Sequence, residues 1–312
     1  AKSISDLLVP NAYEASFRKA YSLNPSVPKG VLESIAFSQS RFYHLNDNQP
    51  ASCIGYPKAY GVMGLTENGQ GYFRNNLIYI SQLSGYSVTD IKSDPEKNIL
   101  AYAKAFSILQ TQQSISGNNL ADYKPVFVAL SELPLTSNLQ SDFAMNSHLY
   151  QLYWFLTQGE FQDFYSFPDY GINLQTIFGN NYAILSANSI VISPTSVTNN
   201  TGATYRSSGV INSVMSADYP PALWVAAGSC NYSFRSGAAI TAVTIHDVEG
   251  SYAGCISWFQ NCAASVSAHY VARSSDGQIT QMVLEVNKAW HVGSENPYTI
   301  GIEHEGYVNQ TG

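Results

Sequence analysis

Hydrophobic positions recur at two different spacings along the chain, and the spacing changes after about residue 187. In the first part, apolar residues such as Val31, Leu32, Ile35 and Phe42 recur at the three- or four-residue interval of a helix face. Pro28 is well placed for the first turn of that helix. Further helices are predicted over residues 95–109, 123–135 and 143–156.

From about residue 223, apolar and polar residues alternate, which is the period of a strand. We predict strands over residues 243–246, 269–272, 279–284 and 299–303, and a helix over 251–259. Strands that are separated by helices are typical of α/β layers. The chain is therefore predicted to hold two domains: an all-α domain over residues 1–187, and an α/β domain with a mixed central sheet over residues 223–312.

The segment between them, residues 188–222, is predicted to be a linker. Residues 193–202 are rich in Ser, Thr and Asn and poor in large apolar side chains, a composition typical of loops. Asn199 begins a glycosylation acceptor motif, but that pattern is common by chance.

Length and charge narrow the classes of function. A chain of 312 residues is long enough for two ordinary domains. Its net charge of -7 argues against a nucleic-acid partner, which would favour a basic surface. No apolar run reaches the roughly 18–20 residues that cross a bilayer, so we predict no membrane span.

Four cysteines leave the disulfide pattern open. Their even number is compatible with two disulfides and an extracytoplasmic location, and it allows three pairings. Cys255 and Cys262 would lie about 10 Å apart along a continuous helix, too far to bond. They could pair only if the helix breaks between them. Free, buried thiols are the alternative for the set of Cys53, Cys230, Cys255 and Cys262.

Two predicted strands each end in a group that could do chemistry. Val243 and Ile245 face one way and His246 the other, while Glu303 faces away from two isoleucines on its own strand. Each strand is therefore expected to bury its aliphatic side chains and to present one functional group. A neutral imidazole is a good zinc ligand, and a nearby carboxylate can activate water. Alone, each group has an ordinary structural explanation, as a hydrogen-bonded histidine or a solvated glutamate.

Taken together, five segments resemble the zinc-dependent N-acetylmuramoyl-L-alanine amidases of the type 2 class. That family includes peptidoglycan recognition proteins and some phage endolysins. The matching segments are Ile245-His246-Asp247-Val248-Glu249, Trp258-Phe259, Ser267-Ala268-His269-Tyr270, Ala289-Trp290-His291 and Ile300-Gly301-Ile302-Glu303.

The resemblance implies roles for individual residues. His246 matches the first zinc ligand, and Glu303 matches the acidic residue that acts as general base on water at the zinc. Trp290 and His291 match a segment beside the substrate groove. The implied reaction is hydrolysis of the amide between N-acetylmuramic acid and the L-alanine of the stem peptide. His269 and Tyr270 match a strand in which packing is at least as good an explanation as catalysis.

The zinc site that the family uses is incomplete in this sequence. Its other two ligands, a His and then a Cys or Asp, normally come later than any residue present here, and catalytic zinc needs about three protein ligands. We expect both ligands beyond Gly312, on a carboxy-terminal piece of the same protein; the alternative is a metal-free fragment. His291 could instead be a second ligand beside His246 and Glu303, although the family pattern argues against this.

Three segments of the first part resemble lysozyme-like transglycosylases: residues 35–42, 60–65 and 94–99. Gln39 stands where that family has its catalytic glutamate, and an amide cannot supply the acid proton. Glu33 would lie about 120° around the helix and roughly 9 Å back along it, so it cannot substitute. We therefore predict an inactive lysozyme-like domain that binds glycan through Gln39. The structural alternative is a buried, hydrogen-bonded glutamine.

The sequence thus predicts an extracytoplasmic peptidoglycan hydrolase, a zinc-dependent amidase joined to a glycan-binding domain. Two alternatives stay open: a peptidoglycan-binding or recognition protein without catalysis, and a muramidase or lytic transglycosylase.

Overall fold

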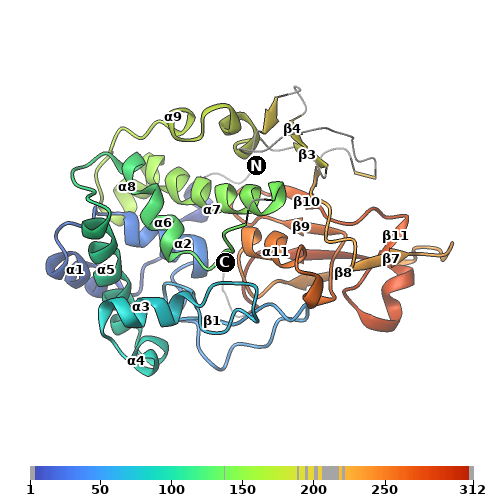
Figure 1. The fold of residues 1–312 in the computed structure, drawn as a ribbon, viewed down its shortest axis with the longest axis horizontal. Coiled ribbons are helices and arrows are strands. Elements are labelled where there is room, and N and C mark those ends of the chain that lie inside the picture. The colour runs from blue at the N-terminus through green and yellow to red at the C-terminus, as the bar shows by residue number, and fades with distance from the viewer. Residues whose placement is uncertain are drawn as a thin grey trace.

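The chain forms a helical half and a sheet half that lie side by side in the computed structural model (Figure 1). The structure describes residues 4–136, 138–187, 190–193, 196–199, 203–205, 218–219 and 222–308. None of the helices in these ranges is long and apolar enough to cross a membrane.

Helices make up the first half. The α-helices there are α1 (Glu14–Leu23), α2 (Val31–Ser40), α3 (Asn76–Ser84), α4 (Val88–Ser93), α5 (Pro95–Gln112), α6 (Lys124–Leu130), α7 (Leu139–Thr157), α8 (Gly159–Tyr165), α9 (Leu174–Phe178) and α10 (Tyr182–Leu185). Short 3₁₀ turns are η1 (Ile4–Leu7), η2 (Leu120–Tyr123) and η3 (Gly179–Asn181), and a small hairpin pairs β1 (Ala59–Tyr60) with β2 (Leu65–Thr66).

Local sequence explains where the predicted helices begin. The Asp94 side chain accepts hydrogen bonds from the backbone N–H groups of Glu96 and Lys97, and Pro95 occupies the first turn, so α5 begins as expected. The α2 helix begins at Val31 rather than at Pro28, because Gly30 adopts a left-handed conformation with φ of 86° immediately before it.

A mixed sheet organises the second half. Its strand order is β5-β4-β3-β6-β10-β9-β12-β8, with parallel pairs flanking β12 and an antiparallel pair of β9 with β10. The strands are β3 (Ile190–Ser193), β4 (Ser196–Asn199), β5 (Thr204–Tyr205), β6 (Leu223–Trp224), β8 (Ala242–Asp247), β9 (Tyr270–Ala272), β10 (Ile279–Gln281) and β12 (Thr299–His304). The other elements are β7 (Tyr232–Phe234), paired with β11 (Asn287–Ala289), and α11 (Tyr252–Trp258), η4 (Cys262–Ala264) and η5 (Gly293–Tyr298). The predicted strands and the predicted helix of this half are therefore present.

The segment expected to be a linker contains strands. Within residues 188–222, β3 and β4 form an antiparallel pair, and β3 also pairs with β6 of the sheet. The run Ile190-Val191-Ile192 is rich in β-branched residues, which favour strands. The Asn199 motif continues into residues that lie outside the described ones.

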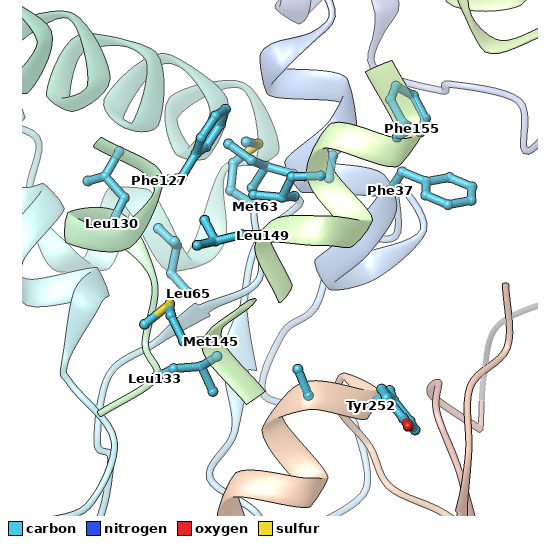
Figure 2. Close-up of a cluster of buried hydrophobic side chains, with 14 of the residues drawn as sticks. Phe37, Met63, Leu65, Phe127, Leu130, Leu133, Met145, Leu149, Phe155 and Tyr252 are labelled. Atoms are coloured by element: carbon cyan, nitrogen blue, oxygen red, sulfur yellow. The ribbon is translucent and has the colours of Figure 1, made fainter. Parts of the chain in front are cut away.

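The two halves share one hydrophobic core. It extends from the helices to α11, where Tyr252 lies near side chains of the helical half (Figure 2). Trp258 of α11 stacks on Phe73, and the Tyr56 ring lies against Gly250 and Gly254. A Cβ on Gly254 would lie 1.9 Å from the Tyr56 hydroxyl, so this glycine is what admits the ring.

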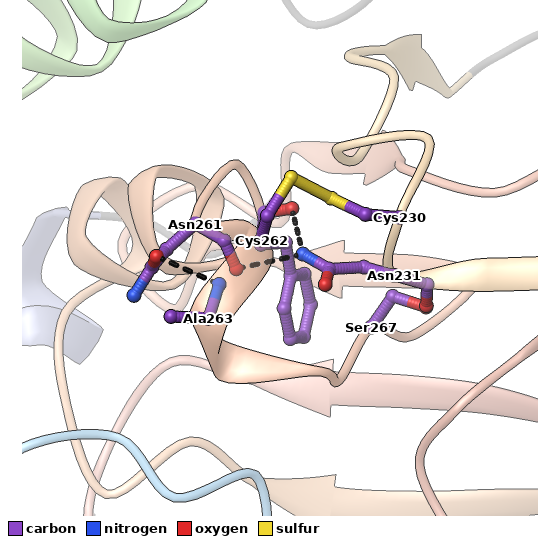
Figure 3. Close-up of a disulfide and its surroundings, with 7 residues drawn as sticks. Cys230, Asn231, Asn261, Cys262, Ala263 and Ser267 are labelled. Carbon is purple, nitrogen blue, oxygen red and sulfur yellow. Dashed lines mark hydrogen bonds between the residues drawn. A yellow bond between two sulfur atoms is a disulfide. The ribbon is translucent and has the colours of Figure 1, made fainter.

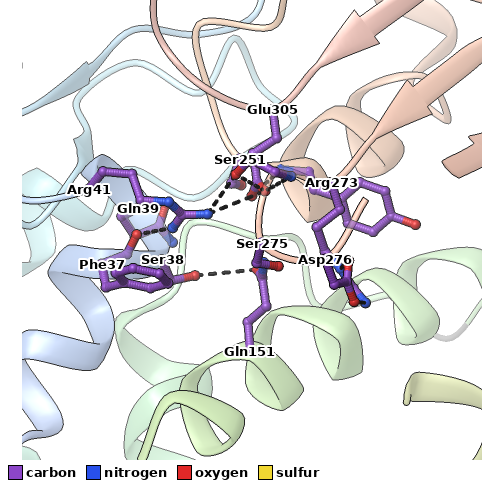
Figure 4. A network of polar contacts seen from close by, with 12 residues as sticks. Phe37, Ser38, Gln39, Arg41, Gln151, Ser251, Arg273, Ser275, Asp276 and Glu305 are labelled. Atoms are coloured by element: carbon purple, nitrogen blue, oxygen red, sulfur yellow. Dashed lines mark hydrogen bonds and ion pairs between the residues drawn. The ribbon is translucent and has the colours of Figure 1, made fainter. Parts of the chain in front are cut away.

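A polar network crosses the same interface (Figure 4). Arg41 lies 3.5 Å from Glu305 in an ion pair that is largely shielded from solvent, and it also donates to Ser274. Glu305 in turn accepts hydrogen bonds from the backbone N–H groups of Tyr252 and Ser274. Buried charges need such partners, so these contacts fix how the halves are docked.

One disulfide joins Cys230 to Cys262, while Cys53 and Cys255 are free (Figure 3). The expectation of two disulfides is therefore wrong, and so is that of four free thiols. The α11 helix ends at Trp258, and the Asn261 side chain caps the turn that presents Cys262. Cys255 lies within α11 and is buried in the core, where its thiol does not reach another cysteine.

The aliphatic face of β8 is exposed, contrary to expectation. Val243 is 58% exposed and Ile245 is 68% exposed, whereas Ile300 on the neighbouring strand is 6% exposed. The reason is position, because β8 is an edge strand of the sheet and nothing in the described residues covers that face.

Candidate metal centre

His246 and Glu303 meet on adjacent strands. The parallel register of β8 and β12 places them directly opposite one another. Opposed residues on paired strands point to the same face, so both side chains leave the sheet towards the helical half. Glu303 is completely buried and His246 is partly buried.

Cys53 joins them from the loop between α2 and β1. Its Sγ lies 3.4 Å from Nδ1 of His246 and 3.9 Å from Oε1 of Glu303. The three donor atoms all lie within 4.8 Å of one another. The cluster thus combines residues from both halves of the molecule.

His291 orients the ring of His246. Its Nδ1 lies 3.2 Å from Nε2 of His246, and its own Nε2 lies 3.2 Å from Oγ1 of Thr299. Because the Thr299 hydroxyl donates to the carbonyl of Glu295, Oγ1 accepts from His291. Nδ1 of His291 then accepts from His246, and this leaves Nδ1 of His246 with a lone pair directed at Cys53.

A glycine makes room for this arrangement. A Cβ on Gly301 would lie 2.6 Å from the His291 ring, so only glycine at that position of β12 lets the ring lie against the strand. His291 contacts His246 but does not belong to the three-residue cluster.

Burial controls the protonation of the site. It raises the pKa of Glu303 to about 8, with a further contribution from the charge of Asp247. Burial also lowers the pKa of His246, and it lowers that of His291 to about 3, helped by the neighbouring histidines and Arg235. Both imidazoles are therefore neutral at pH 7, the form in which a histidine binds a metal.

His269 is held in a structural network. Its Nδ1 accepts from the backbone N–H of Gly301, and its Nε2 lies 2.9 Å from Arg235 and 3.2 Å from the carbonyl of Asn287. Tyr270 donates to Glu285 and is largely buried. These contacts favour packing over catalysis for both residues.

A hollow of about 410 Å³ opens beside the cluster. Trp290 is fixed at its wall by a hydrogen bond from its indole N–H to Ser233. The volume of this hollow is typical of small-ligand sites. The lining residues are Cys53, Ser265, Val266, Lys288, Trp290, His291, Gly293 and Asn296.

Gln39 lies away from this centre. It is buried where the halves meet, its amide lies 3.4 Å from Glu132, and its backbone carbonyl accepts from the Tyr307 hydroxyl. The adjoining cavity holds only about 10 Å³. The structure therefore brings together His246, Glu303, His291 and Trp290, but not Gln39.

The chemistry of the cluster suits a zinc ion. Imidazole nitrogen, thiolate sulfur and carboxylate oxygen are the ligands that zinc prefers. Oε2 of Glu303 is buried and has no hydrogen-bond partner among the described residues. An unpaired buried carboxylate oxygen is costly, and a cation is a partner that removes the cost.

Cys53 is the member of the cluster that the sequence did not reveal. It lies in an irregular loop, 193 positions before His246, so no periodicity connects the two. A cysteine outside the matching segments was the one available signal, and the sequence left its pairing open.

Comparison with known proteins places the second half in a family. Residues 236–312 match the N-acetylmuramoyl-L-alanine amidase family model. The amidase A of Achromobacter lyticus, an N-acetylmuramoyl-L-alanine amidase, is 57% identical over 95 residues, which are 30% of this chain and 53% of that relative. The chain thus spans about half the length of the curated relative that it matches. No solved structure matches at a significant level.

The carboxy-terminal half therefore contains a type 2 N-acetylmuramoyl-L-alanine amidase segment, as its sequence motifs predicted. His246, Trp290, His291 and Glu303 all lie within the matched residues, and Cys53 lies outside them.

Proposed function

We propose that this protein is a zinc-dependent peptidoglycan amidase that cleaves the bond between N-acetylmuramic acid and L-alanine. The observation that carries the proposal is the pairing of His246 with the buried, unpartnered Glu303 inside the amidase-family segment. His246 would hold the ion through Nδ1. Zinc supplies Lewis-acid chemistry, polarising a carbonyl and lowering the pKa of water.

Glu303 is the proposed general base. Its side chain belongs to the cluster and faces His246 from the neighbouring strand, where it can exchange a proton with a water molecule. In its ionised form it takes a proton from the attacking water, and it then returns that proton to the leaving amine of L-alanine. His291 keeps the His246 ring in the orientation that this arrangement needs.

The hollow beside the cluster is the proposed place for the substrate. Trp290 offers a flat apolar surface there, and Lys288 offers a positive charge to an anionic stem peptide. Cleavage then depends on how the side chains that line this hollow position the substrate amide at the cluster.

The glycan-binding role of a lysozyme-like domain over residues 1–187 stays a prediction. Gln39 is covered by Tyr307 in the structure, so sugar binding at Gln39 requires that interface to open. An extracytoplasmic location is part of the proposal, and the Cys230–Cys262 disulfide supports it because such bonds persist in oxidising compartments.

The decisive experiment compares amidase and glycosidase products from purified peptidoglycan. Incubation with the zinc-loaded full chain is expected to release new L-alanine amino termini without new reducing ends. Glu303→Gln should keep the metal but lower turnover by about 10²–10⁴-fold, the usual contribution of a general base. His246→Ala should lose both metal and turnover.

His304→Ala is the matched control, because His304 follows Glu303 on β12 but is exposed. It should behave as the wild type. New reducing ends would indicate the muramidase alternative. Binding to peptidoglycan without any cleavage would indicate a recognition protein and overturn the proposal.

A further inference from the structure

We infer that a second hollow, on the helical half and away from the sheet, binds the glycan strand of peptidoglycan beside Glu33. The choice of this polymer rests on the function proposed above, whereas the site itself lies outside the amidase-family segment. The observations behind the inference are the shape of the hollow, the buried carboxyl group at its wall, and the balance of charge around it.

The hollow lies between α1, the first turn of α2 and the end of α8. Its volume is about 490 Å³, which is within the range of small-ligand sites. Figure 1 shows α1 at the end of the helical half that is remote from the sheet. All of the lining residues belong to the helical half. Glycan bound here would therefore leave the closed interface at Gln39 undisturbed.

Glu33 is the buried polar group of this hollow. It is 6% exposed, and its carboxyl group accepts a hydrogen bond from the Tyr21 hydroxyl, which also belongs to a lining residue. The Tyr21 hydroxyl in turn accepts from the backbone N–H of Leu32, so the pair is fixed at the start of α2. A structural role at this helix end explains these bonds, but it does not explain an open hollow in front of them.

The protonation of Glu33 suits contact with hydroxyl groups. Burial raises the pKa of Glu33 to about 7, and the Tyr21 hydroxyl and the charge of Lys29 offset this only in part. Near neutral pH the carboxyl group therefore exists in both forms. It can donate a hydrogen bond to a ligand hydroxyl when protonated and accept one when ionised.

Aromatic rings form apolar walls around this polar group. Phe17 and Tyr165 line the hollow together with Tyr21. The Tyr165 ring stacks on Phe42, and its hydroxyl donates to the carbonyl of Val9 at 2.7 Å, so the ring is held in place. Rigid aromatic surface beside a few polar groups matches a sugar ring, which has apolar C–H faces and hydroxyl groups at its edge.

The charges around the hollow favour an uncharged ligand. Two acidic and two basic side chains line it: Glu14, Glu33, Arg18 and Lys29. Glu14 and Arg18 form an ion pair with each other, and Lys29 acts on Glu33. This balance disfavours both a phosphate and an ammonium group. In intact peptidoglycan the lactyl group is held in an amide, so the glycan strand is an uncharged polymer rich in hydroxyl groups.

A glycan site on the helical half would serve cleavage on the sheet half. Two sites that engage one polymer raise the effective concentration of the second site once the first is occupied. Glycan held beside Glu33 would thus keep the scissile amides of the same polymer close to the metal cluster. Small substrates that reach only the cluster would gain nothing from the second site.

The test is calorimetric titration of the full chain with a tetramer of N-acetylglucosamine, an uncharged, peptide-free glycan. The wild type should bind it. Ser22→Trp should lose this binding, because Ser22 lines the hollow and an indole there fills it. Ser22 is exposed, so the larger side chain does not disturb the core. Ser26→Trp is the matched control, since Ser26 is exposed and does not line the hollow, and it should bind like the wild type.

Kinetics give a second readout. With polymeric peptidoglycan, Ser22→Trp should raise KM by about tenfold or more, through loss of the second attachment. With a small soluble muropeptide, its kcat and KM should equal those of the wild type. A variant that was merely misfolded would instead lose activity on both substrates.

The outcomes separate this inference from the proposed function. No glycan binding by the wild type, or equal binding by Ser22→Trp, would overturn the inference and leave the amidase standing. Binding of free stem peptide in place of glycan would also overturn it. Glycan binding that Ser22→Trp abolishes, in a chain that releases no L-alanine amino termini, would support the site and overturn the amidase.

Discussion

Outside the candidate metal cluster, a buried carboxyl group is expected to make the stability of the fold depend on pH. Glu33 on α2 is buried and accepts a hydrogen bond from the Tyr21 hydroxyl. Burial raises its pKa to about 7, and the hydrogen bond only partly offsets this. The folded chain therefore holds a proton on Glu33 at pH values at which the unfolded chain has lost it.

This difference predicts a stability that falls as the pH rises. The stabilisation is fully present below the unfolded pKa of about 4.3 and is lost as the pH rises through about 7, a total of the order of 3 kcal/mol. Glu33→Gln should remove that part of the slope in urea unfolding measured between pH 4 and 8. Glu160→Gln, at an exposed position, should leave it unchanged. An unaltered slope in Glu33→Gln would contradict the assignment.

Individual residues also show what could and could not be predicted from the sequence. The alternation around His246 and Glu303 correctly predicted that each points away from its aliphatic neighbours, because strand geometry is local. Cys53 could not be placed, since its position depends on docking contacts with Val248 and Trp258 that are distant in sequence. Gln39 was predicted to bind glycan, and only the tertiary structure reveals that it is buried beside Tyr307.

At the scale of elements, the edge strand β8 has two unlike faces. One carries His246 against the helical half, and the other exposes Val243 and Ile245. The two-residue alternation along β8 predicted that the strand has two unlike faces. It did not predict which face is covered, because coverage depends on the neighbouring elements. On the next strand, Ile300 packs with Ala222 and Tyr270 in a small buried cluster.

The cost of truncating each isoleucine should follow this difference. Ile245→Ala should change the free energy of unfolding by no more than about 0.5 kcal/mol, as at other exposed sites. Ile300→Ala should cost about 2 kcal/mol or more, since it leaves a cavity. Chemical denaturation measures both. Equal costs would mean that another surface covers the exposed face of β8 in solution.

At the scale of the whole molecule, the helical and sheet halves behave as one packed body. The core passes from the helices through Tyr56 and Phe73 to Trp258, and the Arg41–Glu305 network lies at the same interface. The sequence predicted two domains and a linker from changes in composition. It could not predict this interface, because the residues that meet there come from separate segments.

A shared core predicts shared unfolding. Calorimetry should show one cooperative transition for the chain. Trp258→Ala should lower the stability of both halves together, by about 3–5 kcal/mol, because it removes a buried aromatic side chain and its bond to Ile54. Two separate transitions, or a loss confined to the sheet half, would contradict this expectation.

The turn at Ser52–Ile54, which is hydrogen-bonded to Val248 and Trp258 of the sheet half, also has a consequence for timing. A ribosome makes Cys53 long before it makes His246 and Glu303, so the donor atoms are first gathered when the last strand has folded onto the rest. A chain interrupted before that stage, or one whose halves have been cut apart, would carry the separate parts of the centre without the centre itself.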